Sequence, residues 1–193
     1  GMNVAADDII LADGSSQPLH MVGESLLDPG DVVLTEKFAY VGTLGMLRRF
    51  DADIRGIDCD DDGMLPESIE QEIVKATSQV RKPKLIYTIP TFQNPLGWTM
   101  SLERRIQLVE ISQKYEVPIL EDDCYVDLRY EGDPVPAIYS LDDKGCVIYV
   151  ASFSKIIAPG MRLGYLVGPS ELQEDDRATK SEGGDKQIAS IAV

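Results

Sequence analysis

The sequence predicts an α/β fold in which helices cover both faces of a mostly parallel sheet. Seven short apolar runs have the length and composition of buried strands, and segments with one apolar helical face separate several of them. The 193 residues are 44% hydrophobic and 26% charged, which is typical of one globular domain with a packed core. We therefore expect three layers, with a seven-stranded sheet in the middle.

The first third of the chain alternates between strand and helix patterns. Apolar runs indicate strands, and apolar residues repeated at helical spacing indicate helices. Strands are expected within Asp8–Gly14, at Val32–Thr35 and at Ile54–Ile57. Between them, one helix carries Leu19, Val22 and Leu26 on one face, and a second spans Tyr40–Phe50. The aspartate-rich stretch Asp58–Gly63 is expected to be a loop.

The rest of the chain continues this alternation. Pro66 can begin a helix, whose face would carry Ile69, Ile73 and Val80. Ser101 can cap another helix with Leu102, Ile106 and Val109 on one face. The remaining strands are expected at Leu85–Ile89, Val117–Leu120, Val147–Ala151 and Leu163–Val167. Residues 170–193 show little periodicity and are expected to be a frayed helix or a disordered tail.

Charge and cysteine usage exclude several functional classes. The formal net charge of −15 would repel nucleic acids and anionic membranes. The sequence has no apolar window of about 20 residues and no signal-peptide pattern, so we expect a cytoplasmic protein. The three cysteines are widely spaced, which favours reduced thiols and argues against a metal site. The single histidine, His20, is expected to be structural or solvated.

Polar groups follow several predicted strands, where ligands bind in open α/β sheets. Gly14, Ser15 and Ser16 precede a helix, so their N–H groups and hydroxyls can hold a phosphate; an ordinary helix cap is the alternative. Asp122 lies in the acidic run after the fifth strand. A carboxylate there can neutralise a cationic ligand atom or bind Mg²⁺, and solvated loop acids are the alternative.

Two basic residues complete the set. Lys155 follows a buried strand through Ser152, so its amine can be desolvated and nucleophilic, or it can be a surface charge at a helix start. The planar guanidinium of Arg162 suits a phosphate or carboxylate, with a surface salt bridge as the alternative. Phosphate donors, a carboxylate, an amine and a guanidinium together are what a pyridoxal phosphate site requires.

Three motifs in this order resemble the fold-type I pyridoxal-phosphate enzymes, specifically class I/II aminotransferases of the aminoadipate type. They are PTFQNPLG at 90–97, EDDCY at 121–125, and SFSK at 152–155 continuing to APGMRLGY at 158–165. The resemblance also extends to the aminotransferase-like domains of certain bacterial regulators. It covers the chain from about Ile9 to Pro169 and implies the large cofactor-binding domain of this fold.

The resemblance implies a role for each site residue. Lys155 would form a Schiff base with the cofactor aldehyde and move the proton during amino transfer, and Asp122 would pair with the pyridine nitrogen. Tyr125 and Asn94 would hydrogen-bond the phenolic oxygen, and Tyr40 would stack on the ring. The phosphate would be held by Gly14, Ser15, Ser16, Ser152 and Arg162. The duller alternatives are core packing for Tyr40, a turn before Pro95 for Asn94 and a strand-end hydroxyl for Ser152.

The chain departs from the family in length and in two segments. Ser16, Gln17 and Pro18 stand where the family usually has Gln and then Gln-Ala, and residues 37–41 (KFAYV) replace its usual acidic-Pro-x-Tyr-Pro. Family members also carry an N-terminal segment and a C-terminal small domain, which supplies the arginine for the substrate carboxylate. We therefore expect residues 2–169 to be the cofactor-binding domain of a truncated aminotransferase.

Function and assembly follow from the resemblance. The chain would transfer an amino group between an amino acid and a 2-oxo acid, and it would form a homodimer because active sites in this fold usually lie between two subunits. A cofactor-binding or ligand-sensing module without catalysis, as in the regulators, is the first alternative. A folded remnant without cofactor is the second.

Overall fold

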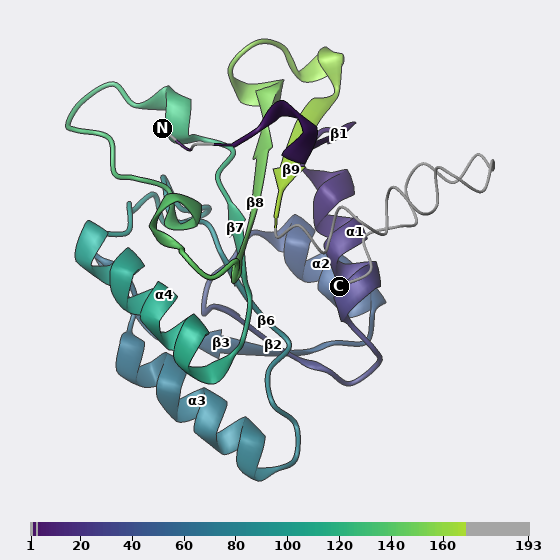
Figure 1. Ribbon diagram of the computed structural model, residues 1–193, viewed down its shortest axis with the longest axis vertical. Coiled ribbons are helices and arrows are strands. Elements are labelled where there is room, and N and C mark those ends of the chain that lie inside the picture. The colour runs from purple at the N-terminus through teal and green to yellow at the C-terminus, as the bar shows by residue number, and fades with distance from the viewer. Residues whose placement is uncertain (1, 3, 169–193) are drawn as a thin grey trace.

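A seven-stranded sheet forms the middle of the structure, a computed structural model that describes residue 2 and residues 4–168 (Figure 1). The strand order is β1-β9-β8-β7-β6-β2-β3. β9 runs antiparallel to β1 and β8, and the other neighbouring pairs are parallel. The predicted mostly parallel α/β fold is therefore confirmed. The strands are β1 (Ile9–Asp13), β2 (Val32–Glu36), β3 (Asp53–Ile57), β6 (Leu85–Thr88), β7 (Ile119–Asp122), β8 (Val147–Ser152) and β9 (Leu163–Val167).

Within the part of the chain that the structure describes, four α-helices cover the sheet, two on each face. α1 (Ser16–Leu26) and α2 (Val41–Arg49) share one hydrophobic cluster with the sheet. α3 (Pro66–Ser78) and α4 (Leu102–Tyr115) share the other, and they lie side by side in Figure 1. Alternate residues of a strand point to opposite faces, so Val33 joins the first cluster while Val32 and Leu34 join the second. This alternation explains why the buried strands read as continuous apolar runs.

Short elements connect these layers. The 3₁₀ helices are η1 (Ala6–Asp8), η2 (Val126–Leu128), η3 (Ile138–Leu141), η4 (Phe153–Lys155) and η5 (Pro159–Met161). The prediction that Asp58–Gly63 is a plain loop is wrong, because it contains β4 (Cys59–Asp60), which pairs with β5 (Gly63–Met64). The Asp60 carboxylate accepts the Asp62 N–H and pairs with Arg104, which holds this hairpin. Strands of two residues are too short to show a sequence period.

The predicted apolar face of the helix after Ser101 is wrong at Leu102 and Ile106, whereas Val109 is buried as predicted. Leu102 and Ile106 are 44% and 42% exposed, whereas Arg105 of the same helix is fully buried. The Arg105 guanidinium can be buried because it donates to the carbonyls of Met100, Pro90 and Pro136 and to the hydroxyl of Thr91. The helical period of the apolar residues predicts that charged residues face solvent. Because Arg105 is buried, the buried face in the structure is rotated relative to the predicted one.

Two predicted boundaries also shift. α3 ends at Ser78, and Val80 is 94% exposed, because Val80 and Arg81 donate their N–H groups back to Thr77 and Ala76 in a turn that ends the helix. The strand predicted at Val117–Leu120 lies at Ile119–Asp122. Buried carboxylates there continue the strand beyond its apolar run. The tail expected at 170–193 lies outside the described residues.

Membrane insertion receives no support from the described helices. None of the helices in residue 2 and residues 4–168 combines the length and apolar character that crossing a bilayer requires.

The end of β2 buries a carboxyl group. Glu36 is 1% exposed; its Oε1 accepts the Thr88 hydroxyl at 2.7 Å and the Ile89 N–H at 2.8 Å. Its Oε2 has no hydrogen-bond partner within the described part of the chain. Burial raises the pKa of Glu36 to about 7, against 4.5 for an unperturbed glutamate. The neutral form therefore suits this position best.

This burial predicts how stability depends on pH. A carboxyl whose pKa is raised by folding contributes stability that is complete below its unfolded pKa and is lost as pH rises through the folded value. The free energy of unfolding of the wild-type chain should fall relative to Glu36→Gln by about 3 kcal/mol between pH 4 and pH 9. Urea unfolding at a series of pH values measures this. Glu67→Gln, at an exposed position, is the control, and an equal pH dependence in the wild type and both variants would contradict the account.

Candidate functional site

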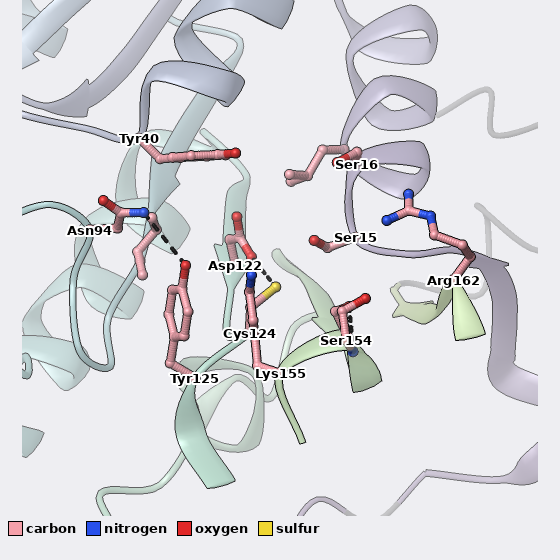
Figure 2. A pocket seen from close by; sticks show the side chains of 13 residues that line it. Ser15, Ser16, Tyr40, Asn94, Asp122, Cys124, Tyr125, Ser154, Lys155 and Arg162 are labelled. Atoms are coloured by element: carbon pink, nitrogen blue, oxygen red, sulfur yellow. Dashed lines mark hydrogen bonds between the residues drawn. The ribbon is translucent and has the colours of Figure 1, made fainter. Parts of the chain in front are cut away.

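One edge of the sheet gathers the polar segments. β6, β7 and β8 are parallel, so the loops that follow them leave the sheet at the same edge. β1 points the same way as β8, because both are antiparallel to β9, and the segment that enters β9 therefore also lies at this edge. A cavity of about 190 Å³ opens there (Figure 2).

The cavity brings together the residues that the sequence analysis selected, with the exception of Gly14. Its lining includes Ser15, Ser16, Tyr40, Asn94, Asp122, Tyr125, Ser152, Lys155 and Arg162. Gly14 lies beside it, with a φ of 67° that favours glycine, and donates its N–H to the carbonyl of Arg162 at 3.1 Å. A Cβ atom on Gly14 would lie 3.0 Å from Arg162 Nη2, so glycine lets the guanidinium approach the backbone.

Asp122 is the acid of the predicted set that lines the cavity. It is 5% exposed, and it accepts hydrogen bonds from Tyr87 Oη at 2.9 Å and from Cys124 Sγ at 3.0 Å. Burial raises the pKa of Asp122, and these two hydrogen bonds oppose that effect. The alternative of solvated loop acids is therefore wrong for this carboxylate.

Its neighbours Glu121 and Asp123 are buried but do not line the cavity. Glu121 accepts the N–H groups of Ile138 and Tyr139, and it lies 3.9 Å from the Arg105 guanidinium, so it anchors η3 to the sheet. Burial raises the pKa of Glu121 to about 8 and that of Asp123 to about 6. Among the described residues, no group of three or more acids, histidines or cysteines is arranged to hold a metal ion.

Lys155 ends η4, directly after β8. Ser152 Oγ accepts the Ser154 N–H at 3.2 Å and so caps this turn. Lys155 lines the cavity, but the expectation that burial desolvates its amine is wrong, because the side chain is exposed. η4 carries the lysine past the end of the strand to the open side of the cavity. Figure 2 shows the Lys155 side chain beside Asp122 and Cys124.

Arg162 forms the surface salt bridge that the sequence left open as one of two alternatives. Its backbone adopts a φ of 49°, and its Nε donates to Asp13 Oδ1 at 3.1 Å in an exposed ion pair. It also lines the cavity, on the side where Figure 2 shows Ser15 and Ser16. The guanidinium, the two hydroxyls and the start of α1 form a positive, hydrogen-bonding end of the cavity.

Aromatic and amide groups form the opposite end. Asn94 Nδ2 lies 3.5 Å from Tyr125 Oη, at hydrogen-bond distance, so the loops after β6 and β7 meet here. Tyr40 precedes α2 and lies above Asp122 in Figure 2. Its ring covers Gly42, where an added Cβ would come within 2.5 Å of the Tyr40 ring.

Four further lining residues were not selected from the sequence. They are Leu19, Ile89, Cys124 and Ser154. Ser154 is the most informative, because its hydroxyl oxygen is buried and has no hydrogen-bond partner among the described residues. Its position in the SFSK motif could have revealed it, since Ser152 and Ser154 both precede the lysine. Leu19 and Ile89 carry no chemical signal in the sequence. His20 stays outside the cavity, exposed and with its ring 5.0 Å from that of Phe50.

Comparison with known proteins decides the family. The family model described as aminotransferase class I and II matches residues 2–183. The chain belongs to this aminotransferase family. It is 40% identical to aromatic-amino-acid aminotransferase 1 of Thermococcus litoralis over 159 residues, which are 82% of this chain and 38% of that protein. It is also 34% identical over 173 residues to YisV, an uncharacterised HTH-type transcriptional regulator of Bacillus subtilis, with 90% and 35% of the two chains covered.

Solved aminotransferases share the fold. The kynurenine aminotransferase of Pyrococcus horikoshii, solved in complex with PMP, superposes with a TM-score of 0.86 at 39% identity. That match covers 96% of this chain and 46% of the solved one. The chain thus spans less than half the length of these relatives.

β9 packs closely against the backbone of Gly14, next to the cavity. This packing predicts one position where an added side chain should lower stability. A Cβ on Gly164 would lie 2.4 Å from the Gly14 carbonyl carbon and oxygen, so the backbone itself would have to move. We expect Gly164→Ala to lower the free energy of unfolding by about 2 kcal/mol or more. The matched control is Gly45→Ala in α2, where the added methyl meets nothing within 4 Å and should raise stability by about 0.5–1 kcal/mol. Similar effects of the two substitutions in urea unfolding would contradict this packing.

Proposed function

We propose that this chain is the cofactor-binding domain of an aminotransferase that transfers an amino group between an amino acid and a 2-oxo acid with pyridoxal phosphate. The observation that carries the proposal is the convergence of Lys155, Asp122 and Arg162 on one cavity, although they are distant in sequence. The cited relatives named as aminotransferases and the complex of one with PMP support it.

The positive end of the cavity fits the phosphate group. The buried, unpartnered hydroxyl of Ser154 requires a hydrogen-bond partner, and a phosphate oxygen provides one. Ser15, Ser16 and Ser152 would add hydroxyl donors, and Arg162 would supply the matching charge. The N–H groups at the start of α1, next to Gly14, would also point toward the anion.

The middle of the cavity fits a protonated aromatic ring. The Asp122 carboxylate is buried and would be neutralised by a ring N–H⁺, which would offset the cost of its burial. Tyr40 would cover one face of the ring, and Asn94 and Tyr125 would hydrogen-bond its phenolic oxygen.

Lys155 would carry the covalent and proton-transfer chemistry. When bound, pyridoxal phosphate supplies an aldehyde that bonds amines and a ring that accepts electron density from the substrate α-carbon. The Lys155 amine would bond the aldehyde carbon, and after the amine of an incoming amino acid replaces it there, Nζ would take the proton from the substrate α-carbon and deliver it to the former aldehyde carbon of the cofactor. Asp122 would meanwhile keep the ring nitrogen protonated.

We further propose the following domain arrangement and assembly. Residues 2–169 would form the cofactor-binding domain, with 170–193 as a tail, and the arginine that binds the substrate carboxylate would come from a domain outside this chain. Two copies would form a homodimer in the cytoplasm. Phe38, Val41 and Leu96 are 59%, 73% and 54% exposed next to the cavity residues Tyr40 and Asn94, and this apolar rim would be covered by the second copy.

A ligand-sensing domain is the second candidate. The similarity over 90% of this chain to the HTH-type regulator YisV favours it. Such a domain would bind pyridoxal phosphate through the same residues but would not transfer amino groups. An amino-donor assay with several 2-oxo acids, carried out on the holo-protein, separates the two functions.

The lysine provides the direct test. Wild-type chain incubated with pyridoxal phosphate and reduced with borohydride should gain the cofactor mass on Lys155, and the visible absorbance of the bound cofactor should shift on reduction. Lys155→Ala should lose the mass increase completely, because it lacks the amine that bonds the aldehyde. Lys144→Ala, which removes an exposed lysine outside the cavity, should label like the wild type. Labelling that is absent in the wild type, or unchanged in Lys155→Ala, would overturn the proposal.

A further inference from the structure

A buried chain of hydrogen bonds ends on the Asp122 carboxylate. Thr43 Oγ1 in α2 donates to Tyr87 Oη in β6 at 3.0 Å, and Tyr87 Oη donates to Asp122 Oδ2 at 2.9 Å. Cys124 Sγ donates to the other oxygen, Oδ1, at 3.0 Å. Each carboxylate oxygen therefore has one protein donor, and these donors come from different segments of the chain.

The direction of each hydrogen bond is fixed by proton count. Tyr87 has one hydroxyl proton and Cys124 has one thiol proton, while an ionised carboxylate can only accept. Burial holds the pKa of the Tyr87 hydroxyl and of the Cys124 thiol well above their usual values, so both groups keep their protons. Thr43 occupies a lone pair of the Tyr87 oxygen and so directs the tyrosine proton toward Asp122.

The donors are buried, so little water can replace them. Tyr87, Thr43 and Cys124 are 0%, 2% and 9% exposed. A carboxylate in this setting needs donors of its own to remain ionised, because water reaches so little of it.

We propose that Tyr87 and Cys124 are positioning residues that keep the Asp122 carboxylate ionised and aimed at the ring nitrogen of the cofactor, with Thr43 orienting Tyr87. This inference rests on the proposed function. Neither Tyr87 nor Thr43 lines the cavity, so they would act on the cofactor only through Asp122.

Other charged or titratable groups surround the same carboxylate. Glu36 at the end of β2 and Asp123 next in the chain are acids, and each opposes the charge of Asp122 when it is itself ionised. Lys155 and Arg162 line the cavity, and the phenols of Tyr40 and Tyr125 lie there as well. These groups are the same in the variants below, so differences between variants report on the two donors.

The chain offers a matched control for each substitution. Tyr115 Oη lies 3.1 Å from Glu70 Oε1, and Cys146 Sγ lies 3.2 Å from Asp142 Oδ1, both at hydrogen-bond distance and outside the cavity. Tyr115→Phe and Cys146→Ala thus remove the same kind of contact to a carboxylate as Tyr87→Phe and Cys124→Ala. Thr43→Val keeps the shape of Thr43, the first residue of the hydrogen-bond series, but removes its hydroxyl. Cys124→Ser keeps a hydrogen-bond donor to Asp122 at position 124.

The first measurement follows the Asp122 carboxyl by carbon-13 NMR across pH in the cofactor-free chain. Tyr87→Phe should raise the pKa of Asp122 by about one unit, Cys124→Ala and Thr43→Val should raise it less, and Cys124→Ser should leave it near the wild-type value. Both controls should titrate like the wild type. An Asp122 pKa that is unchanged in Tyr87→Phe and Cys124→Ala would overturn the inference.

The second measurement is the affinity for pyridoxal phosphate and, separately, for inorganic phosphate. Tyr87→Phe should weaken pyridoxal phosphate binding about tenfold and leave phosphate binding unchanged, because only the ring depends on Asp122. If the wild type and Tyr87→Phe bind pyridoxal phosphate with equal affinity, the positioning role of Tyr87 is overturned and the proposed function is not. A wild-type chain that does not bind pyridoxal phosphate would instead overturn the proposed function, while the NMR titration still decides whether the two donors hold Asp122 ionised.

Discussion

The parallel order of β6, β7 and β8 is the constraint on which the site depends. Parallel strands release the chain at the same edge, so Asn94, Asp122 and Lys155 meet although each belongs to a different crossover unit. Arg162 reaches the same edge because it precedes β9, which runs antiparallel to β1. Gly164 lets β9 pack against the Gly14 backbone. Without this topology, no local feature of the four segments would bring their polar groups together.

The same edge concentrates buried acids. Glu36, Glu121, Asp122 and Asp123 are each at most 5% exposed, and they share few nearby cations, with Arg105 placed beside Glu121. Hydrogen bonds from backbone N–H groups, Tyr87 and Cys124 offset part of the cost of this burial. Under the proposed function, a cationic ring between Asp122 and Tyr40 would offset more of it, so cofactor binding and stability would be linked.

Much of this arrangement could be predicted from the sequence, and the failures have physical causes. Apolar runs such as Val147–Ala151 identify buried strands, and strand-end polar residues such as Lys155 identify the edge where the cavity lies, because both follow from local pattern. The helical period predicts Leu102 and Ile106 on the buried face, whereas the structure buries Arg105, because the burial of an arginine depends on carbonyls that are distant in sequence. The exposure of Lys155 and the unpartnered Ser154 hydroxyl likewise depend on tertiary contacts, which no residue pattern contains.

A crystal structure of the chain loaded with pyridoxal phosphate would test the central claim most directly. The account predicts continuous density from Lys155 Nζ to a ring whose nitrogen lies within hydrogen-bond distance of Asp122, with the phosphate against Ser154 and Arg162. Cofactor density outside this cavity, or a ring in the cavity whose nitrogen faces away from Asp122, would contradict it.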